Sequence, residues 1–161
     1  MAGPAAGTRK LNLDAGRVAA VADELKLPPP FDQMHSPFDE LIGGEVLGID
    51  PDGARARVAM REELAQPFGI MHGGVYSSAI EGLCSLATAA AVWDDGMIAV
   101  GQAINVNFVR PVSEGVAEVR ARARHRGRTT WLWDVEVVDD RERLCATSTM
   151  TMAVRPRPAG A

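Results

Sequence analysis

One acidic side chain stands in the middle of a long apolar stretch of this sequence. Glu81 has Ser77 four residues before it and Ser85 four residues after it, so in a helix the three side chains form a narrow polar stripe on one face. A carboxylate in such a setting is costly to bury unless it has partners. Two interpretations are open on spacing alone: Glu81 faces a solvated groove, or it is a catalytic carboxylate.

The segment ahead of this stretch has residue types that can bind a developing negative charge. Met71-His72-Gly73-Gly74 lies where a loop meets the expected helix. Two glycines let the backbone approach a ligand closely. The first N–H groups of a helix have no partner within it and can bind a carbonyl oxygen that gains negative charge. A histidine before two glycines is common in turns, so this motif alone is weak evidence.

Composition and cysteine usage exclude several classes of protein. The chain has 161 residues, 47% of them hydrophobic and 24% charged, which is typical of one globular domain. Its formal net charge of −4 argues against general binding of nucleic acid. Two cysteines and three histidines are too far apart in the chain to indicate a metal site or a disulfide framework. We therefore expect no metal and no cofactor.

The apolar segments indicate no targeting or membrane function. Residues 1–16 lack the apolar core of a secretory signal, and the apolar stretch at 80–93 is interrupted by polar residues and is too short to span a bilayer. No glycine-rich nucleotide-binding motif occurs. We expect a cytoplasmic protein that contacts no membrane.

Periodicity and turn signals predict the elements that position these residues. Helices are expected at 13–27, as one turn at 36–41, and at 73–92. Strands are expected at 45–49, 54–60, 99–109, 115–125, 129–138 and 144–154. Short turns between the last four strands favour an antiparallel meander. The prediction is an α+β fold in which the long helix covers the apolar face of the sheet.

Several apolar side chains are expected to serve packing. Trp131 and Trp133 share a strand face and are predicted to lie in the core or an interface. Cys84 is predicted to be a buried small side chain and not a nucleophile. Tyr76, in the first turn of the helix, either packs in the core or lines a pocket.

The run from Gln66 to Glu81 resembles the signature of hotdog-fold acyl-CoA thioesterases. In that signature a His-Gly-Gly precedes a helix whose acidic residue falls nine positions after the histidine, as Glu81 does here. Segments 104–111 and 125–129 are also similar to the family, and the resemblance covers roughly 38–154. It implies a hotdog fold, with a long central helix wrapped by an antiparallel β-sheet. The implied division is an N-terminal extension at 1–35 with a short helix, a hotdog thioesterase domain at 36–155 and a loose tail at 156–161.

The residue at position 81 narrows the branch of the family. Glutamate there is similar to the 4-hydroxybenzoyl-CoA thioesterases and to the menaquinone-pathway thioesterases, whereas phenylacetate-pathway thioesterases usually carry aspartate. Ser85 stands where the hydroxybenzoyl enzymes carry threonine, so the hydroxyl is kept and a methyl group is lost. The resemblance implies hydrolysis of an acyl-CoA, with an aromatic acyl group as one candidate.

The resemblance also implies roles for individual residues. Glu81 would act as nucleophile or as general base toward water. The Gly73 N–H would donate to the oxyanion, with His72 and Gln66 orienting the carbonyl region and Ser85 holding the water.

Arginine side chains suit the phosphates of coenzyme A. Five of the 17 basic residues lie between positions 120 and 128, and Arg120 and Arg122 are expected on a solvated outer face of the sheet. The residues expected to bind the phosphates are Arg110, Arg128, Thr129 and Thr130.

Helix geometry predicts that one subunit holds only half of the site. Glu81 is eight residues from Gly73, which is about 12 Å along one helix. A carboxylate must come within about 3–3.5 Å of the reacting carbon. We therefore expect Gly73 of one chain to act with Glu81 of another, in agreement with a family whose sites lie at the dimer interface. Pairing of dimers into tetramers is expected from the same resemblance.

Two other functions compete with hydrolysis. A non-catalytic acyl-CoA-binding sensor would use the same pocket, although such a regulator usually needs a DNA-binding element. A hotdog hydratase or dehydratase would pair a carboxylate with a histidine in a different arrangement, which the spacing from His72 to Glu81 fits less well.

Overall fold

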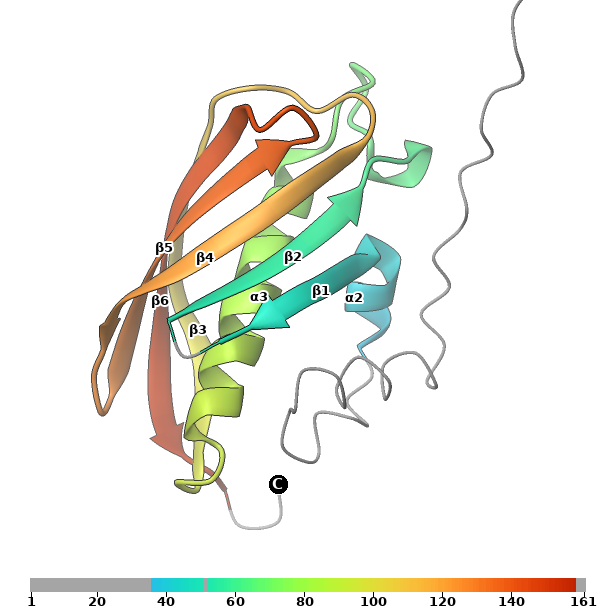
Figure 1. Cartoon of the computed structure of the whole chain (residues 1–161). Helices are drawn as coiled ribbons and strands as arrows, with labels where there is room; N and C mark the ends of the chain where they lie inside the picture. Colours follow the sequence, from blue (N-terminus) through green and yellow to red (C-terminus); the bar gives the residue numbers. More distant parts are fainter. Residues whose placement is uncertain (1–35, 51, 159–161) are drawn as a thin grey trace, which may run out of the picture.

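The computed structural model describes residues 36–50 and 52–158 (Figure 1). The expected helix at 13–27 lies outside these residues. The helical elements are α2 (Pro37–Ile42), the 3-10 turn η1 (Glu62–Leu64) and the long helix α3 (Gly73–Val92). The strands are β1 (Gly44–Ile49), β2 (Gly53–Ala59), β3 (Met97–Phe108), β4 (Val116–Arg126), β5 (Thr130–Asp139) and β6 (Leu144–Pro156). The predicted elements within the described residues are confirmed, to within two residues at each end.

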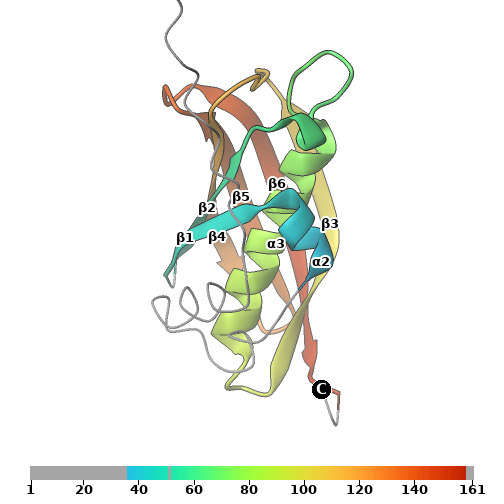
Figure 2. The same cartoon turned by 90° about the vertical axis from the view of Figure 1, so that its right-hand side faces the viewer.

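All six strands form one antiparallel sheet with the order β1-β2-β4-β5-β6-β3. The sheet curves around α3, which runs along one of its faces (Figures 1 and 2). This confirms the predicted α+β fold, a long central helix wrapped by an antiparallel sheet.

The predicted meander is wrong for β3. That strand pairs with β6 along its whole length and does not contact β4, its successor in the chain. The segment at 109–115 crosses one end of the sheet to reach β4 (Figure 1), a distance of three strand spacings or about 14 Å. Seven residues are long enough for this crossing. The consequence is that β3 becomes an edge strand of the sheet.

The helix α3 packs on the sheet through one apolar side. Its buried residues include Ile80, which has no exposed surface, and Thr88. The Trp133 Nε1–H donates to Thr88 Oγ1 over 3.0 Å, and the same hydroxyl donates to the Cys84 carbonyl. Trp131 and Trp133 are both buried, which confirms their predicted place in the core.

The apolar stretch at 80–93, which by itself is too short to span a bilayer, belongs, apart from its last residue, to the longer helix α3. It has 20 residues, and an 18-residue window of it has a mean hydropathy of 1.3, so α3 is long and apolar enough to span a membrane by length and composition. Its apolar side chains instead provide the contact with the sheet.

Candidate active site

The histidine of the His-Gly-Gly motif caps the N-terminus of α3. His72 has an extended backbone, and its Nδ1 accepts a hydrogen bond from the Gly74 N–H over 2.9 Å. In the neutral ring this bond assigns the proton to Nε2. The Val75 N–H donates to the His72 carbonyl, whereas the Gly73 N–H meets no acceptor within residues 36–50 and 52–158. The first N–H group of α3 is therefore available to a ligand.

An aromatic ring from β3 lies against this helix end. A Cβ atom added to Gly73 would lie 2.9 Å from Cζ of Phe108, closer than such atoms approach in proteins. The Phe108 ring also tilts against Tyr76, with ring centroids 5.8 Å apart. The sequence pattern indicates that Gly73 lets a ligand approach, and the structure adds that Phe108 leaves no room for a side chain there.

The predicted polar stripe is present, with direct contact between two of its members. The Ser85 hydroxyl donates to Oε1 of Glu81 over 2.8 Å. Ser77 instead donates to the Gly73 carbonyl over 3.3 Å. Glu81 is exposed in the single chain, so its carboxylate is open to a ligand or water. The resemblance implied that Ser85 holds a water molecule, and the structure places its hydroxyl on the carboxylate itself.

The two central groups of the site contact opposite ends of one strand. Gly73 lies against Phe108, the last residue of β3, while Glu81 lies against Gly101 near its start. These contacts, like the helical rise of about 12 Å, keep Gly73 and Glu81 apart within one chain.

Gln66 lies in the loop that leads into α3. Its backbone N–H donates to the Ile70 carbonyl, and its own carbonyl accepts from the Gly69 N–H, which closes a tight turn. Gly69 has a φ of 73°, a conformation that glycine adopts without strain. The bridge between Ala65 and Met71 holds the base of this turn. The turn therefore fixes the backbone position of Gln66 in the loop before His72. The side chain of Gln66 is half-buried.

The residues expected to bind coenzyme A fall into two groups. Arg128, Thr129 and Thr130 lie at the turn between β4 and β5. Arg110 follows β3 at the other end of the sheet, where it donates to the Leu144 carbonyl over 3.1 Å. The structure does not bring these groups together within one chain.

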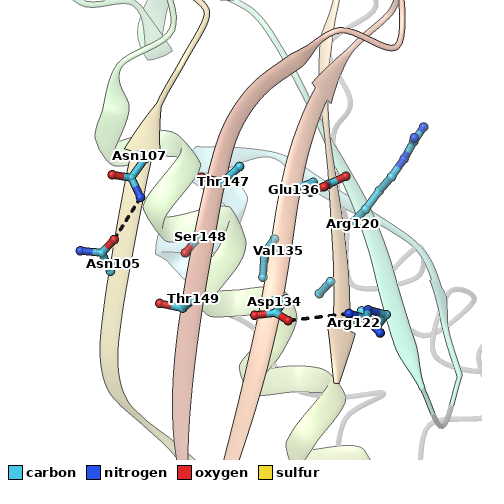
Figure 3. A pocket seen from close by; sticks show the side chains of 11 residues that line it. Asn105, Asn107, Arg120, Arg122, Asp134, Val135, Glu136, Thr147, Ser148 and Thr149 are labelled. Carbon is cyan, nitrogen blue, oxygen red and sulfur yellow. Dashed lines mark hydrogen bonds and ion pairs between the residues drawn. The ribbon is translucent and has the colours of Figure 1, made fainter. Parts of the chain in front are cut away.

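Arg120 and Arg122 lie on the outer face of the sheet, as predicted. Arg120 bonds Glu142 with both of its terminal nitrogens, and Arg122 is 3.8 Å from Asp134. This face carries a hollow of about 560 Å³. Figure 3 shows the side chains that line it, with α3 behind the strands. It is lined mainly by polar side chains, including Asn105, and by none of the predicted catalytic residues.

Cys84 lies on α3 but has no exposed surface. Burial, and to a smaller extent the charge of Glu81, raises the pKa of the Cys84 thiol to about 12. The thiol is therefore protonated at neutral pH, which supports its predicted structural role. Burial likewise raises the pKa of Tyr76 to about 12. In the described part of the chain, no three histidine, cysteine, aspartate or glutamate side chains are grouped to hold a metal ion.

Comparison with known proteins assigns this chain to a family. The profile of the thioesterase superfamily matches residues 68–146. The Mycobacterium tuberculosis protein Rv1847 is 40% identical over 114 residues, which are 68% of this chain and 80% of that protein. The 1,4-dihydroxy-2-naphthoyl-CoA hydrolase of Listeria monocytogenes is 30% identical over 120 residues, covering 74% of this chain and 97% of the hydrolase. The chain belongs to the thioesterase superfamily.

Solved structures agree with this assignment. The crystal structure of a Haemophilus influenzae thioesterase matches with a TM-score of 0.70 and 30% identity. The match covers 74% of the chain described here and 82% of the Haemophilus chain. The resemblance found in the sequence is thereby confirmed. The enzyme is a thioesterase with the hotdog fold.

Proposed function

We propose that this thioesterase hydrolyses acyl-CoA thioesters at a site shared by two protomers. The Gly73 N–H of one protomer would bind the thioester oxygen, and the partner's Glu81 would carry out the attack or activate water. The observation that supports this most is the pair of contacts along β3, where Gly73 meets Phe108 and Glu81 meets Gly101.

The free edge of β3 offers the surface for such a pairing. Val100, Ile104 and Phe108 are 49%, 39% and 57% exposed, although they belong to a strand of the sheet. Two copies of β3, paired antiparallel about a two-fold axis near the middle of the strand, would place the Gly101 end of one strand beside the end of its partner that carries Phe108. That pairing would bring Glu81 beside the partner's Gly73. Assembly of such dimers into tetramers stays a prediction.

The chemistry follows from these groups. As negative charge develops on the thioester oxygen, the Gly73 N–H stabilises it. In a general-base reaction, a water oxygen bonds to the carbonyl carbon and its proton moves to Glu81; the C–S bond then breaks and Glu81 returns the proton to the departing thiolate. In a nucleophilic reaction, Glu81 itself bonds to the carbonyl carbon, the C–S bond breaks to release the thiolate of coenzyme A, and water hydrolyses the resulting anhydride to the free acid and the carboxylate of Glu81. His72 and Gln66 would orient the carbonyl, and Ser85 would hold the carboxylate.

The position of the β4–β5 turn supports coenzyme A binding there. One row of paired residues crosses β5, β6 and β3 and consists of Trp131, Met152 and Gly101. Gly101 in this row contacts Glu81, and the β4–β5 turn ends next to Trp131. The turn therefore lies close to the Glu81 end of β3. Arg128, Thr129 and Thr130 would bind the phosphates at that turn. In the proposed pairing, the partner's Arg110 reaches the same end of the sheet.

An aromatic acyl group is the favoured substrate within this class. Phe108 and Tyr76 form an aromatic pair directly beside Gly73, and aromatic groups pack well against such rings. The name of the Listeria relative also specifies an aromatic acyl-CoA.

Replacement of the proposed catalytic carboxylate tests this function. Glu81→Gln should lower kcat for aryl-CoA and alkyl-CoA thioesters by at least about 100-fold, because the amide neither attacks nor accepts a proton. The control is Glu136→Gln, which removes an exposed carboxylate from the outer face. Turnover retained in Glu81→Gln would remove Glu81 from the mechanism. Binding of a non-hydrolysable CoA analogue without turnover by the unmodified protein would favour a sensor.

A further inference from the structure

A glycine in β3 leaves room for the carboxylate of Glu81. A Cβ atom added to Gly101 would lie 2.8 Å from Oε1 of Glu81 and 3.2 Å from Cε of Met150. Neither distance is compatible with an ordinary side chain at position 101 unless its neighbours move. Nothing in the local sequence around Gly101 relates it to a residue on α3, so only the tertiary structure reveals this contact.

The backbone at this position does not itself require glycine. Gly101 is absent from the residues with positive φ, which among the described glycines are Gly43, Gly69, Gly96 and Gly115. The strand does change register between Gly101 and Ala103, so β3 carries a bulge next to the carboxylate. What crowds a side chain at position 101 is therefore the contact with Glu81 of α3 and, less closely, with Met150 of β6.

The same oxygen of Glu81 is held from two directions. Oε1 accepts the hydrogen bond from Ser85 and lies over Gly101. A methyl group at position 101 would push Oε1 away from the strand and strain the bond to Ser85. A displacement of about 1 Å is enough to lower a reaction rate by about 100-fold.

We propose that Gly101 is a positioning residue for Glu81, holding the carboxylate in its reactive place by giving it space against β3. The proposal rests on the proposed function of Glu81. It assigns to the bulge of β3 a role in catalysis in addition to its role in the sheet.

The kinetic test compares two glycines in similar settings. Gly48 of β1 also flanks a register shift, has no positive φ, and would have nothing within 4 Å of an added Cβ. Gly101→Ala should lower kcat by about 10- to 100-fold and change KM by less than about twofold, because the reacting group moves while the substrate contacts remain. Gly48→Ala should keep both constants. A kcat of Gly101→Ala equal to that of Gly48→Ala would overturn the proposal.

A thermal test needs no activity and separates this role from a merely structural one. Gly101→Ala should lower the midpoint of thermal unfolding by about 3–10 °C in the otherwise unchanged protein. In the Glu81→Ala background, where the carboxylate is gone and only Met150 stays close, the same change should lower the midpoint clearly less. The proposal would be overturned if the midpoint fell equally in both backgrounds or in neither. It would also be overturned if both Gly101 variants failed to fold.

The two tests also distinguish this proposal from the proposed function. If the unmodified protein hydrolyses no acyl-CoA, the proposed function fails, and the role of Gly101 in positioning a catalytic group fails with it. If the unmodified protein is active and Gly101→Ala is equally active, only the role of Gly101 fails.

Discussion

The Ser85 hydroxyl donates its hydrogen bond to Oε1 of Glu81, the same oxygen that lies over Gly101. Within the described residues, Oε2 of that carboxylate receives no hydrogen bond. The two oxygens therefore differ: in the proposed mechanism Oε1 would orient the group, and Oε2 would attack a thioester or accept a proton from water. This division of roles leads to the first prediction.

Ser85→Ala should lower kcat by about tenfold with little change in KM, because loss of a hydrogen bond to a charged group frees the carboxylate to rotate. Ser85→Thr keeps the hydroxyl and should retain most of the activity. Ser78→Ala is the control, since that hydroxyl bonds the Gly74 carbonyl on the same helix. Steady-state assays of the three variants decide; equal activity of Ser85→Ala and Ser78→Ala would contradict this role.

Gly73→Pro should lower kcat by about 100-fold or more relative to Gly73→Ala, because only proline removes the N–H. Proline is well tolerated as the first residue of a helix, and the φ of −65° and ψ of 136° at His72 suit the residue before a proline. Both variants bring a Cβ atom against Phe108, so the comparison isolates the donor. Similar kcat values for the two variants would show that another group binds the oxyanion.

Mixed dimers should recover activity from two inactive variants. If the site is shared, a dimer of Glu81→Gln with Gly73→Pro contains one intact site, and random mixing should restore about one quarter of the activity of the unmodified protein. The measurement is turnover after co-expression of the two variants with separate tags. If each site lay within one chain, every protomer would keep a damaged site and activity would stay lost. Absence of recovered activity would therefore contradict the shared site. The control is each variant co-expressed with itself.

Asp139 should contribute to stability above about pH 4 and lose that contribution in acid. Hydrogen bonds from the Arg143 side chain, and then from the Arg143 and Arg141 N–H groups, lower the pKa of Asp139 from 3.8 to about 2. Since the pKa in the folded state lies below that of the unfolded chain, the stabilisation is present above the unfolded value and is lost as pH falls toward 2.

The measurement for Asp139 is urea unfolding between pH 5 and pH 2. Asp139→Asn should be less stable than the unmodified protein at pH 5, and the difference should shrink as the pH falls. A difference for Asp139→Asn that stays constant with pH would contradict the prediction.

The long helix and its polar stripe could be predicted from the sequence. Gly73 and Val92 are the ends of α3 as expected, because a capping histidine precedes the apolar run and a turn follows it. The contact of Ser85 with Glu81 depends only on helical spacing. The separation of Gly73 from Glu81 depends only on the helical rise. These features are local, so nearby residues determine them.

The place of β3 was decided by the tertiary structure. Periodicity identifies a strand but not its partner, and β3 pairs with β6, more than 30 residues further along the chain. That pairing leaves the edge of β3 free and sets its two ends against Gly73 and Glu81. The contacts of Phe108 and Gly101 with α3 follow from how the helix lies on the sheet. Their physical origin is close packing between elements distant in sequence, which the spacing of residues along one element does not determine.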